Sequence, residues 1–384
     1  MVDPILGDCS LDSLRNRTSF KWRTYPDDVL PAFVAEMDFD PAPEIKQVIR
    51  ALLDAGDLGY PHKGELGDAF AEFASDRLGW EIDPDLVFPV PDVMTGVAEV
   101  IQAITEPGAG IVINPPVYAP FFFRLELTGR RIVEAPLQGN QDGSYDLDLD
   151  AVDRALMKPG TGAYLLCNPH NPLGRVWSRD ELTAVADLCD RRGIPLLVDE
   201  IHAPLVLPGA RHVPFHTVEH PAARQAFVFS SASKGWNIPG LKCGIAVAGT
   251  AAAGAILEER WEALLASHLG VHATVAALRH ARPWLDAAVA QVDANTRELA
   301  VLLAERVPGV RYRPPQASFL AWLDCRELGV GDDPSAVFLE RGKVALSPGP
   351  HFGTQGRGFA RLNIGTAPAL IAEAVDRMAA ALVR

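Results

Sequence analysis

Lys234 stands in a stretch that could support nucleophilic chemistry, because it lies among hydroxyl and glycine residues just after an apolar run. Residues 230–244 read SSASKGWNIPGLKCG, and they follow AFVF, a run that predicts a buried strand. A lysine amine becomes a good nucleophile when its pKa falls, and it can then form a Schiff base with an aldehyde. The spacing SxxK alone is weak, since serine hydrolases also contain it. A solvated loop lysine is the simpler alternative.

Polar residues that could assist such a lysine follow two further apolar runs. Asn171 comes shortly after AYLLC, and Asp199 comes directly after PLLV. Pyridoxal phosphate is the common aldehyde cofactor, and its site needs a lysine, an acid for the ring nitrogen, a group for the ring oxygen and donors for the phosphate. Asp199 would be the acid and Asn171 would contact the ring oxygen. Ser231, Lys242 and the amides of residues 93–96, which open a predicted helix, would meet the phosphate.

The elements that must position these residues follow from the hydrophobic pattern. Seven short apolar runs, from LVFPV to GIAVAG, alternate with helical patterns between residues 86 and 249. Such strands indicate a mainly parallel sheet covered by helices on both faces. Ligands bind beyond the carboxyl ends of the strands of these sheets, so the polar strand ends should converge on one crevice. The last third of the chain predicts a smaller α+β domain.

Composition excludes several classes of protein. The chain has 384 residues and a net charge of −14, which argues against a nucleic-acid partner. No apolar run reaches the roughly 18 residues of a membrane span, and the polar N-terminus does not resemble a signal peptide. Five scattered cysteines indicate reduced thiols and a cytoplasmic protein. His212, His216 and His220 have helical spacing, but Pro214 and Pro221 interrupt it, so we predict no metal site.

The chain resembles the fold-type I pyridoxal-phosphate enzymes, the class I/II aminotransferase group, over essentially its whole length. The motifs that carry the resemblance occur in family order: LGYPHKGELGDAF, NPPVYAPFF, CNPHNPLGRVW, LLVDEIHAPLV, SSASKGWNIPGLKCG and FARLNIGT. VLPAFVAEMDF and SPGPHFG are most similar to the cystathionine β-lyase or cysteine C-S lyase branch. The resemblance implies an α/β fold with a seven-stranded sheet. It also implies an N-terminal segment (1–45) that packs with the small domain, a large cofactor-binding domain (46–275) and a small C-terminal domain (276–384).

The resemblance also implies roles for single residues. Lys234 would bind the cofactor and move protons, and Asp199 would pair with the ring nitrogen. Arg361 would bind the substrate α-carboxylate through a bidentate fork, and Asp38 is a candidate for the substrate entrance. Tyr60, counted with the catalytic residues, would reach the phosphate of the neighbouring subunit, which implies a homodimer with shared active sites. The other cofactor contacts would come from Val93, Met94, Thr95, Tyr118, Asn171, His202, Ser231 and Lys242.

The branch predicts the reaction, and two alternatives stay open. The expected activity is that of a carbon–sulfur β-lyase, which cleaves L-cystathionine or a related S-substituted L-cysteine to a thiol, pyruvate and ammonia. The alternatives are an aminotransferase that uses a keto-acid acceptor and a regulatory protein with the same fold. The chain departs from the usual pattern of the branch at several positions. Asp92 stands where a glycine is usual, and Lys242 stands where many relatives have arginine.

Overall fold

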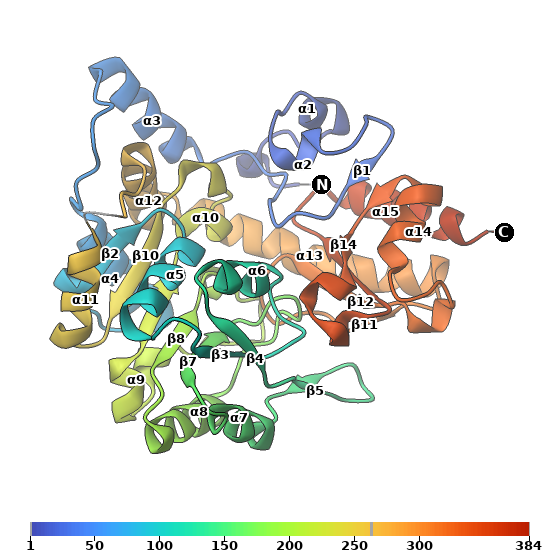
Figure 1. Cartoon of the computed structure of the whole chain (residues 1–384). Coiled ribbons are helices and arrows are strands. Elements are labelled where there is room, and N and C mark those ends of the chain that lie inside the picture. Colours follow the sequence, from blue (N-terminus) through green and yellow to red (C-terminus); the bar gives the residue numbers. More distant parts are fainter. Residues whose placement is uncertain (1, 262–263, 384) are drawn as a thin grey trace.

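A seven-stranded sheet forms the centre of the larger part of the molecule (Figure 1). The computed structural model describes residues 2–261 and 264–383. Within these ranges the strand order is β2-β10-β9-β8-β7-β3-β4. Strand β10 runs opposite to the other six strands, which share one direction, so the mainly parallel sheet predicted from the sequence is confirmed. The strands are β2 (Val87–Val90), β3 (Gly110–Ile113), β4 (Arg131–Glu134), β7 (Thr161–Cys167), β8 (Leu196–Asp199), β9 (Phe227–Ser230) and β10 (Gly244–Ala248).

Both faces of this sheet are buried, because successive side chains of a strand point to opposite sides. In β7, Tyr164 and Leu166 belong to one core cluster, whereas Ala163 and Leu165 belong to the other. No helix in the described ranges combines the length and apolar character needed to cross a membrane. One face is covered by α5 (Val93–Ile104), α6 (Pro120–Leu127) and α11 (Ala251–Trp261), and the other by α4 (Leu66–Leu78), α7 (Leu149–Leu156), α8 (Arg179–Arg192), α9 (Pro221–Gln225) and α12 (His268–His280).

A smaller antiparallel sheet lies beside the first, with the order β11-β12-β15-β14. Within it β11 (Arg311–Tyr312) pairs antiparallel with β12 (Leu320–Asp324), which agrees with the smaller α+β domain predicted for the last third of the chain. The N-terminal strand β1 pairs with β13, and Figure 1 shows the N-terminal helices near α14 and α15. The domain limits at residues 46 and 276 stay predictions. The other elements here are β14 (Ser347–Pro348), β15 (Phe359–Asn363), β1 (Leu30–Pro31), β13 (Val344–Ala345), α1 (Leu11–Arg15), α2 (Phe20–Arg23), α13 (Arg282–Arg306), α14 (Pro334–Gly342) and α15 (Pro368–Leu382).

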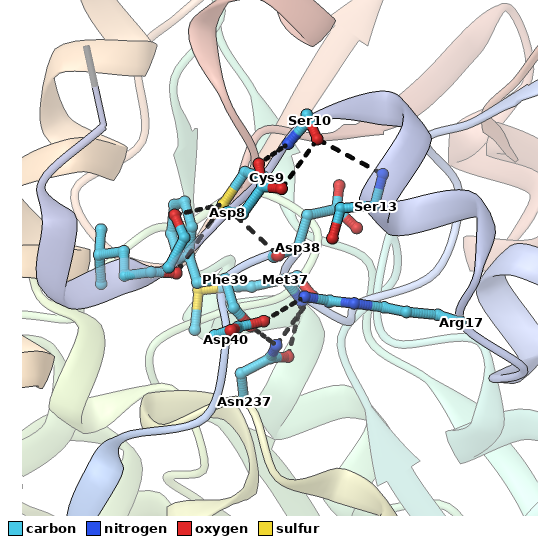
Figure 2. Close-up of polar contacts among 12 residues, drawn as sticks. Asp8, Cys9, Ser10, Ser13, Arg17, Met37, Asp38, Phe39, Asp40 and Asn237 are labelled. Carbon is cyan, nitrogen blue, oxygen red and sulfur yellow. Dashed lines mark hydrogen bonds and ion pairs between the residues drawn. The ribbon is translucent and has the colours of Figure 1, made fainter.

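Residues 33–40, which we call the strap, connect the two sheets. Asn237 lies in the loop after α10 (Ala232–Gly235), on the side of the large sheet, and its side chain binds the strap. Its side chain accepts a hydrogen bond from the amide of Met37 and donates to the carbonyls of Met37 and Phe39 (Figure 2). From the small sheet, the Asn363 amide donates to two further carbonyls of the strap, at 2.7 and 2.6 Å. The strap is therefore fixed to both halves of the molecule.

The remaining helices and strands lie outside the two main sheets. Helix α3 (Pro43–Ala55) projects from the body at the upper left of Figure 1, and α12 packs against it. A hairpin of β5 (Gln138–Gly139) and β6 (Tyr145–Asp146) lies between β4 and α7. Helix α10 (Ala232–Gly235) begins directly after β9 and contains Lys234.

Candidate active site

The carboxyl ends of β7, β8 and β9 meet at one edge of the large sheet. The pairing register places Cys167, Asp199 and Phe229 side by side across the three strands. Asn171 follows β7 by four residues, and Lys234 follows β9 by four residues. The structure therefore brings together the strand ends that the sequence indicated, as the topology of a parallel sheet requires.

A cavity of about 290 Å³ lies at this edge of the sheet. Its walls come from the loops after β7, β8 and β9, from the beginning of α5 and from the residues before α6. Four of the predicted site residues are absent from its lining: Thr95, Arg361, Tyr60 and Asp38. The predicted residues that line it are Val93, Met94, Tyr118, Asn171, Asp199, His202, Ser231, Lys234 and Lys242.

A larger groove of about 1120 Å³ lies between the β5–β6 hairpin and the small sheet. No lysine, cysteine or histidine lines the groove among the described residues. Its four arginines each contact a carboxylate of the chain, as Arg313 contacts Asp142 at 2.6 Å. The smaller cavity is therefore the candidate site for chemistry, because it contains an amine and a carboxylate that are not engaged with such partners.

Lys234 supplies the amine of this cavity. Its Nζ donates a hydrogen bond of 2.6 Å to the carbonyl oxygen of Ala35 in the strap. Burial, together with the positive charge of Arg361, lowers the pKa of Lys234 to about 8. A sizeable neutral fraction is therefore present near neutral pH, and only the neutral amine is nucleophilic.

Asp199 supplies the carboxylate, and its side chain is 3% exposed. Its Oδ1 accepts a hydrogen bond of 3.0 Å from the backbone amide of Ile201. Burial raises the pKa of Asp199 to about 7. No arginine or lysine forms an ion pair with it in the described part of the chain. A buried carboxylate without a cationic partner favours the binding of a positively charged group beside it.

Arg361 reaches the site from β15, next to Asn171. Its guanidinium donates to the Asn171 side-chain oxygen at 3.1 Å, and to the carbonyl of Phe33 and the hydroxyl of Ser347 at 3.0 Å each. The Arg361 Nε is buried and has no partner among the described residues. Burial lowers the pKa of this guanidinium to about 10. Because no carboxylate of the described chain neutralises it, Arg361 can bind the carboxylate of a ligand.

Two ring side chains complete the centre of the cavity. Tyr118 lines it with its ring edge-to-face against Phe121, and burial raises the pKa of Tyr118 to about 12, so it stays neutral. His202 packs edge-to-face against Phe319, and its buried Nδ1 has no partner among the described residues. Burial, together with Lys234 and Arg361, lowers the pKa of His202 to about 3, so this imidazole is neutral as well.

The opposite end of the cavity is the N-terminus of α5. Asp92 is the N-cap of this helix, and its Oδ1 accepts a hydrogen bond of 2.8 Å from the Thr95 amide. The Asp92 Oδ2 forms an ion pair with Lys242. Strand β10 approaches so closely that a Cβ atom on Gly244 would lie 3.0 Å from the backbone nitrogen of Val93. Glycine at 244 therefore lets the start of the helix, Lys242 and the end of β9 come together.

The structure does not bring Asp38 or Tyr60 to the cavity of the same chain. Asp38 is 2% exposed and accepts hydrogen bonds from Lys21 Nζ at 2.8 Å and from Trp22 Nε1 at 3.1 Å. Because Lys21 is itself buried, this pair is a structural contact beneath the strap. Tyr60 is 88% exposed and lies outside its own cavity.

Sequence reasoning missed the part of the site that the strap forms. The carbonyls of Phe33 and Ala35 contact Arg361 and Lys234, but backbone oxygens have no signature in a sequence. Asn237 and Asn363, whose side-chain amides bind the strap, could have been recognised from their positions in the sequence. They stand three residues after Lys234 and two residues after Arg361, inside the motifs KGWN and RLN.

Comparisons with known proteins agree with this geometry. Residues 34–378 match the family described as aminotransferase class I and II. A Mycobacterium leprae protein with the provisional name cystathionine beta-lyase is 44% identical, over 100% of this chain and 99% of that protein. The cystathionine beta-lyase PatB of Bacillus subtilis is 35% identical over 92% of this chain and 93% of its own. Cystalysin of Treponema denticola, whose crystal structure contains pyridoxal 5'-phosphate, superimposes with a TM-score of 0.92 at 27% identity and covers 100% of this chain and 99% of its own.

These matches extend over nearly the whole chain, so they concern the complete fold and not one motif. The chain therefore belongs to the class I and II aminotransferase family, and within it to the group of the cystathionine β-lyases.

Proposed function

We propose that this protein is a pyridoxal-phosphate-dependent carbon–sulfur β-lyase. It would cleave L-cystathionine or a related S-substituted L-cysteine to a thiol, pyruvate and ammonia. The observation that carries the proposal is one cavity with the Lys234 amine and the buried Asp199 carboxylate, next to the unpaired Arg361. The lyase reaction is favoured over transamination by the relatives named cystathionine beta-lyase, at 35% and 44% identity.

The cavity fits pyridoxal phosphate. When bound, this cofactor supplies an aldehyde for a lysine amine and a ring that withdraws electrons from the bonds at the amino acid Cα. Asp199 can hold a protonated ring nitrogen, because it is buried without a cation. The first amides of α5, at Val93 and Met94, have no partner inside the helix and can bind a phosphate. The remaining residues that would hold the cofactor are Thr95, Tyr118, Asn171, His202, Ser231, Lys234 and Lys242.

Two residues of the chain would act on different groups of the substrate, Arg361 on the α-carboxylate and Lys234 on the Cα proton. Arg361 would bind the α-carboxylate with its fork and so fix the orientation of Cα. The neutral Lys234 Nζ would take the proton from Cα, and its position is set by the Ala35 carbonyl 2.6 Å away. Loss of the Cα proton is followed by departure of the thiolate from Cβ. Lys234 can also return a proton to the reacting molecule, which is the step that transamination needs.

The proposal is tested by product analysis without a keto acid. The purified protein should absorb near roughly 420 nm when the cofactor is bound to a lysine. L-cystathionine alone should then yield pyruvate and free thiol in equal amounts. Absence of pyruvate together with amino-group transfer to an added keto acid would identify an aminotransferase instead.

Replacing Arg361 with lysine should weaken substrate binding. A lysine keeps the positive charge but loses the bidentate fork, so we expect KM for the amino acid to rise about tenfold or more, with a smaller change in kcat. Arg326→Lys, at an exposed arginine near the same sheet, is the matched control. An unchanged KM in Arg361→Lys would show that the α-carboxylate binds elsewhere.

We also propose a homodimer in which Tyr60 serves the active site of the neighbouring subunit. Support comes from its 88% exposure, from its absence from the cavity lining of its own chain and from the exposed apolar residues Leu53 and Leu58 that precede it in the sequence. The particle mass should be twice the chain mass of 41.4 kDa.

A mixing experiment tests the shared site directly. Tyr60→Ala and Lys234→Ala chains should each be nearly inactive alone. A mixed dimer contains one intact site, formed by Lys234 of one chain and Tyr60 of the other. Equal amounts, unfolded and refolded together, should therefore recover about a quarter of the wild-type activity, since half of the dimers are mixed. No recovery, or full activity of Tyr60→Ala alone, would contradict the shared site.

We further propose that the protein works in the cytoplasm. All five cysteines are free and buried, which is the state expected of thiols in a reducing compartment. Cell fractionation followed by immunodetection checks this location, and recovery in an extracellular fraction would contradict it.

A further inference from the structure

Asp92 places a negative charge at the end of the cavity where the cofactor phosphate is expected. Its Oδ1 holds the Thr95 amide at 2.8 Å, and its Oδ2 holds the Lys242 ammonium. Burial raises the pKa of this carboxyl, but Lys242 and the Thr95 amide outweigh that effect and lower it below its ordinary value. Asp92 is therefore ionised near neutral pH. The carboxylate makes the two kinds of contact that a bound phosphate makes, to a helix amide and to a cation.

Several predicted phosphate donors are consequently engaged inside the protein. The Thr95 amide and the Lys242 ammonium are both used by Asp92. The Ser231 hydroxyl donates to the carbonyl of Cys243 at 2.7 Å and accepts from the amide of Ser233 at 3.0 Å. A phosphate at this helix must therefore share these groups with Asp92 or displace it.

The charge balance makes this sharing unfavourable. The positive charge of Lys242 is offset by Asp92, so the pair offers a dianion no net attraction. Attraction for the phosphate then comes from the partial positive charge of the α5 N-terminus, equivalent to roughly half an elementary charge. Arg124, which also lines the cavity, adds a second source of positive charge. The Asp92 carboxylate at this helix N-terminus repels the phosphate, and because its side chain is only 29% exposed, solvent screens that repulsion in part.

We propose that Asp92 is an internal competitor of the cofactor phosphate, which weakens cofactor binding and speeds cofactor release. This proposal rests on the proposed pyridoxal-phosphate dependence. The protein would therefore exchange its cofactor with free cofactor in solution and exist partly in the cofactor-free form. In that form the Asp92–Lys242 ion pair adds no net charge at the N-terminus of α5. The alternative role for Asp92, orienting Lys242 toward the phosphate, predicts the opposite sign for every Asp92 variant.

The test measures cofactor binding and not turnover. Cofactor-free wild type and Asp92→Asn are titrated with pyridoxal phosphate and followed by the absorbance of the lysine-bound form. Asparagine keeps the shape and the N-cap hydrogen bond to Thr95 but removes the charge. We expect Asp92→Asn to lower the Kd at least about tenfold, a change within the range of one interaction with a charged group. The dissociation rate, measured by dilution into a cofactor trap, should fall by a similar factor.

Pyridoxal, which lacks the phosphate, is the decisive control ligand. Its affinity should be equal for wild type and Asp92→Asn, because pyridoxal places no charge at the N-terminus of α5. Asp148→Asn is the matched control variant, since Asp148 caps α7 through the Ala151 amide in the same manner and lies outside the cavity. Asp148→Asn should leave both affinities unchanged. Asp92→Gly is a second variant in case asparagine disturbs the turn, as glycine is also accepted at an N-cap.

The outcomes separate this proposal from the proposed function. Tighter binding of pyridoxal phosphate alone, in Asp92→Asn or Asp92→Gly, supports the competitor role. Equal or weaker binding of pyridoxal phosphate in both variants overturns it, while the proposed function stands as long as Lys234 binds the cofactor. If wild type and variants show no lysine-bound absorbance at any concentration, the proposed function fails and the competitor role fails with it.

Discussion

The Lys234→Ala protein is expected to lose the absorbance near roughly 420 nm and to lose turnover by at least about a thousandfold. The physical reason is that Lys234 is the amine that lines the cavity beside Asp199, with its pKa lowered to about 8. Alanine removes both the group that binds the aldehyde and the base that takes the Cα proton. Lys158→Ala is the control, because Lys158 is exposed and does not line the cavity.

The pH dependence of cofactor attachment gives a second readout for the same lysine. Below a pKa of about 8 the amine is mostly protonated, and a protonated amine cannot attack an aldehyde. The rate at which the cofactor-free protein gains absorbance should therefore rise between pH 6 and pH 8 and level off above about pH 8. A rate that keeps rising in proportion to hydroxide up to pH 10 would show that burial does not activate Lys234.

The parts of the site that lie at strand ends could be predicted from the sequence, for a reason that depends on topology. Asn171, Asp199 and Lys234 each follow a short apolar run whose alternation with helical patterns indicates a strand of a covered sheet. Once the strands are parallel, their carboxyl ends must lie at one edge, so the three residues come together without knowledge of the strand order. The same reasoning places the amides of α5 at that edge.

Pairings between side chains distant in sequence could not be predicted in this manner. Asp38 is part of a motif near the N-terminus, but its burial against Lys21 depends on how the strap packs on the rest of the chain. The ion pair of Asp92 with Lys242 joins residues 150 positions apart. It depends on the antiparallel strand β10 lying beside β2, and on the close approach that Gly244 allows. A sequence shows which residues are charged, whereas the fold decides which charges cancel.

The Asp199→Asn protein should keep its cofactor but lose most of its activity. Asparagine has nearly the same shape, and the contacts of Lys234 and of the α5 N-terminus remain, so the absorbance of the lysine-bound form should persist. The negative charge that would hold the ring nitrogen protonated is lost. Removing one preorganised electrostatic contact of this kind lowers kcat by about a hundredfold to a thousandfold. Near-normal kcat in Asp199→Asn would show that the ring nitrogen needs no charged partner in this protein.

The same substitution that lowers activity should raise the stability of the cofactor-free protein. This opposite effect would show that the charge of Asp199 is responsible for both changes. Burial raises the pKa of Asp199 to about 7 from the ordinary 3.8, so the folded state binds this proton more tightly than the unfolded state does. Ionised Asp199 therefore destabilises the folded protein increasingly as the pH rises from about 4 to about 7, and the full cost is present above about pH 7. Cofactor-free Asp199→Asn should unfold at a higher denaturant concentration than wild type at pH 8, with a smaller difference at pH 5. Asp190→Asn, at an exposed position of α8, should show neither effect. Lower stability of Asp199→Asn at pH 8 would mean that a group of the protein already neutralises the carboxylate in the absence of the cofactor. The prediction that Asp199 is a buried carboxylate without a cationic partner would then be wrong.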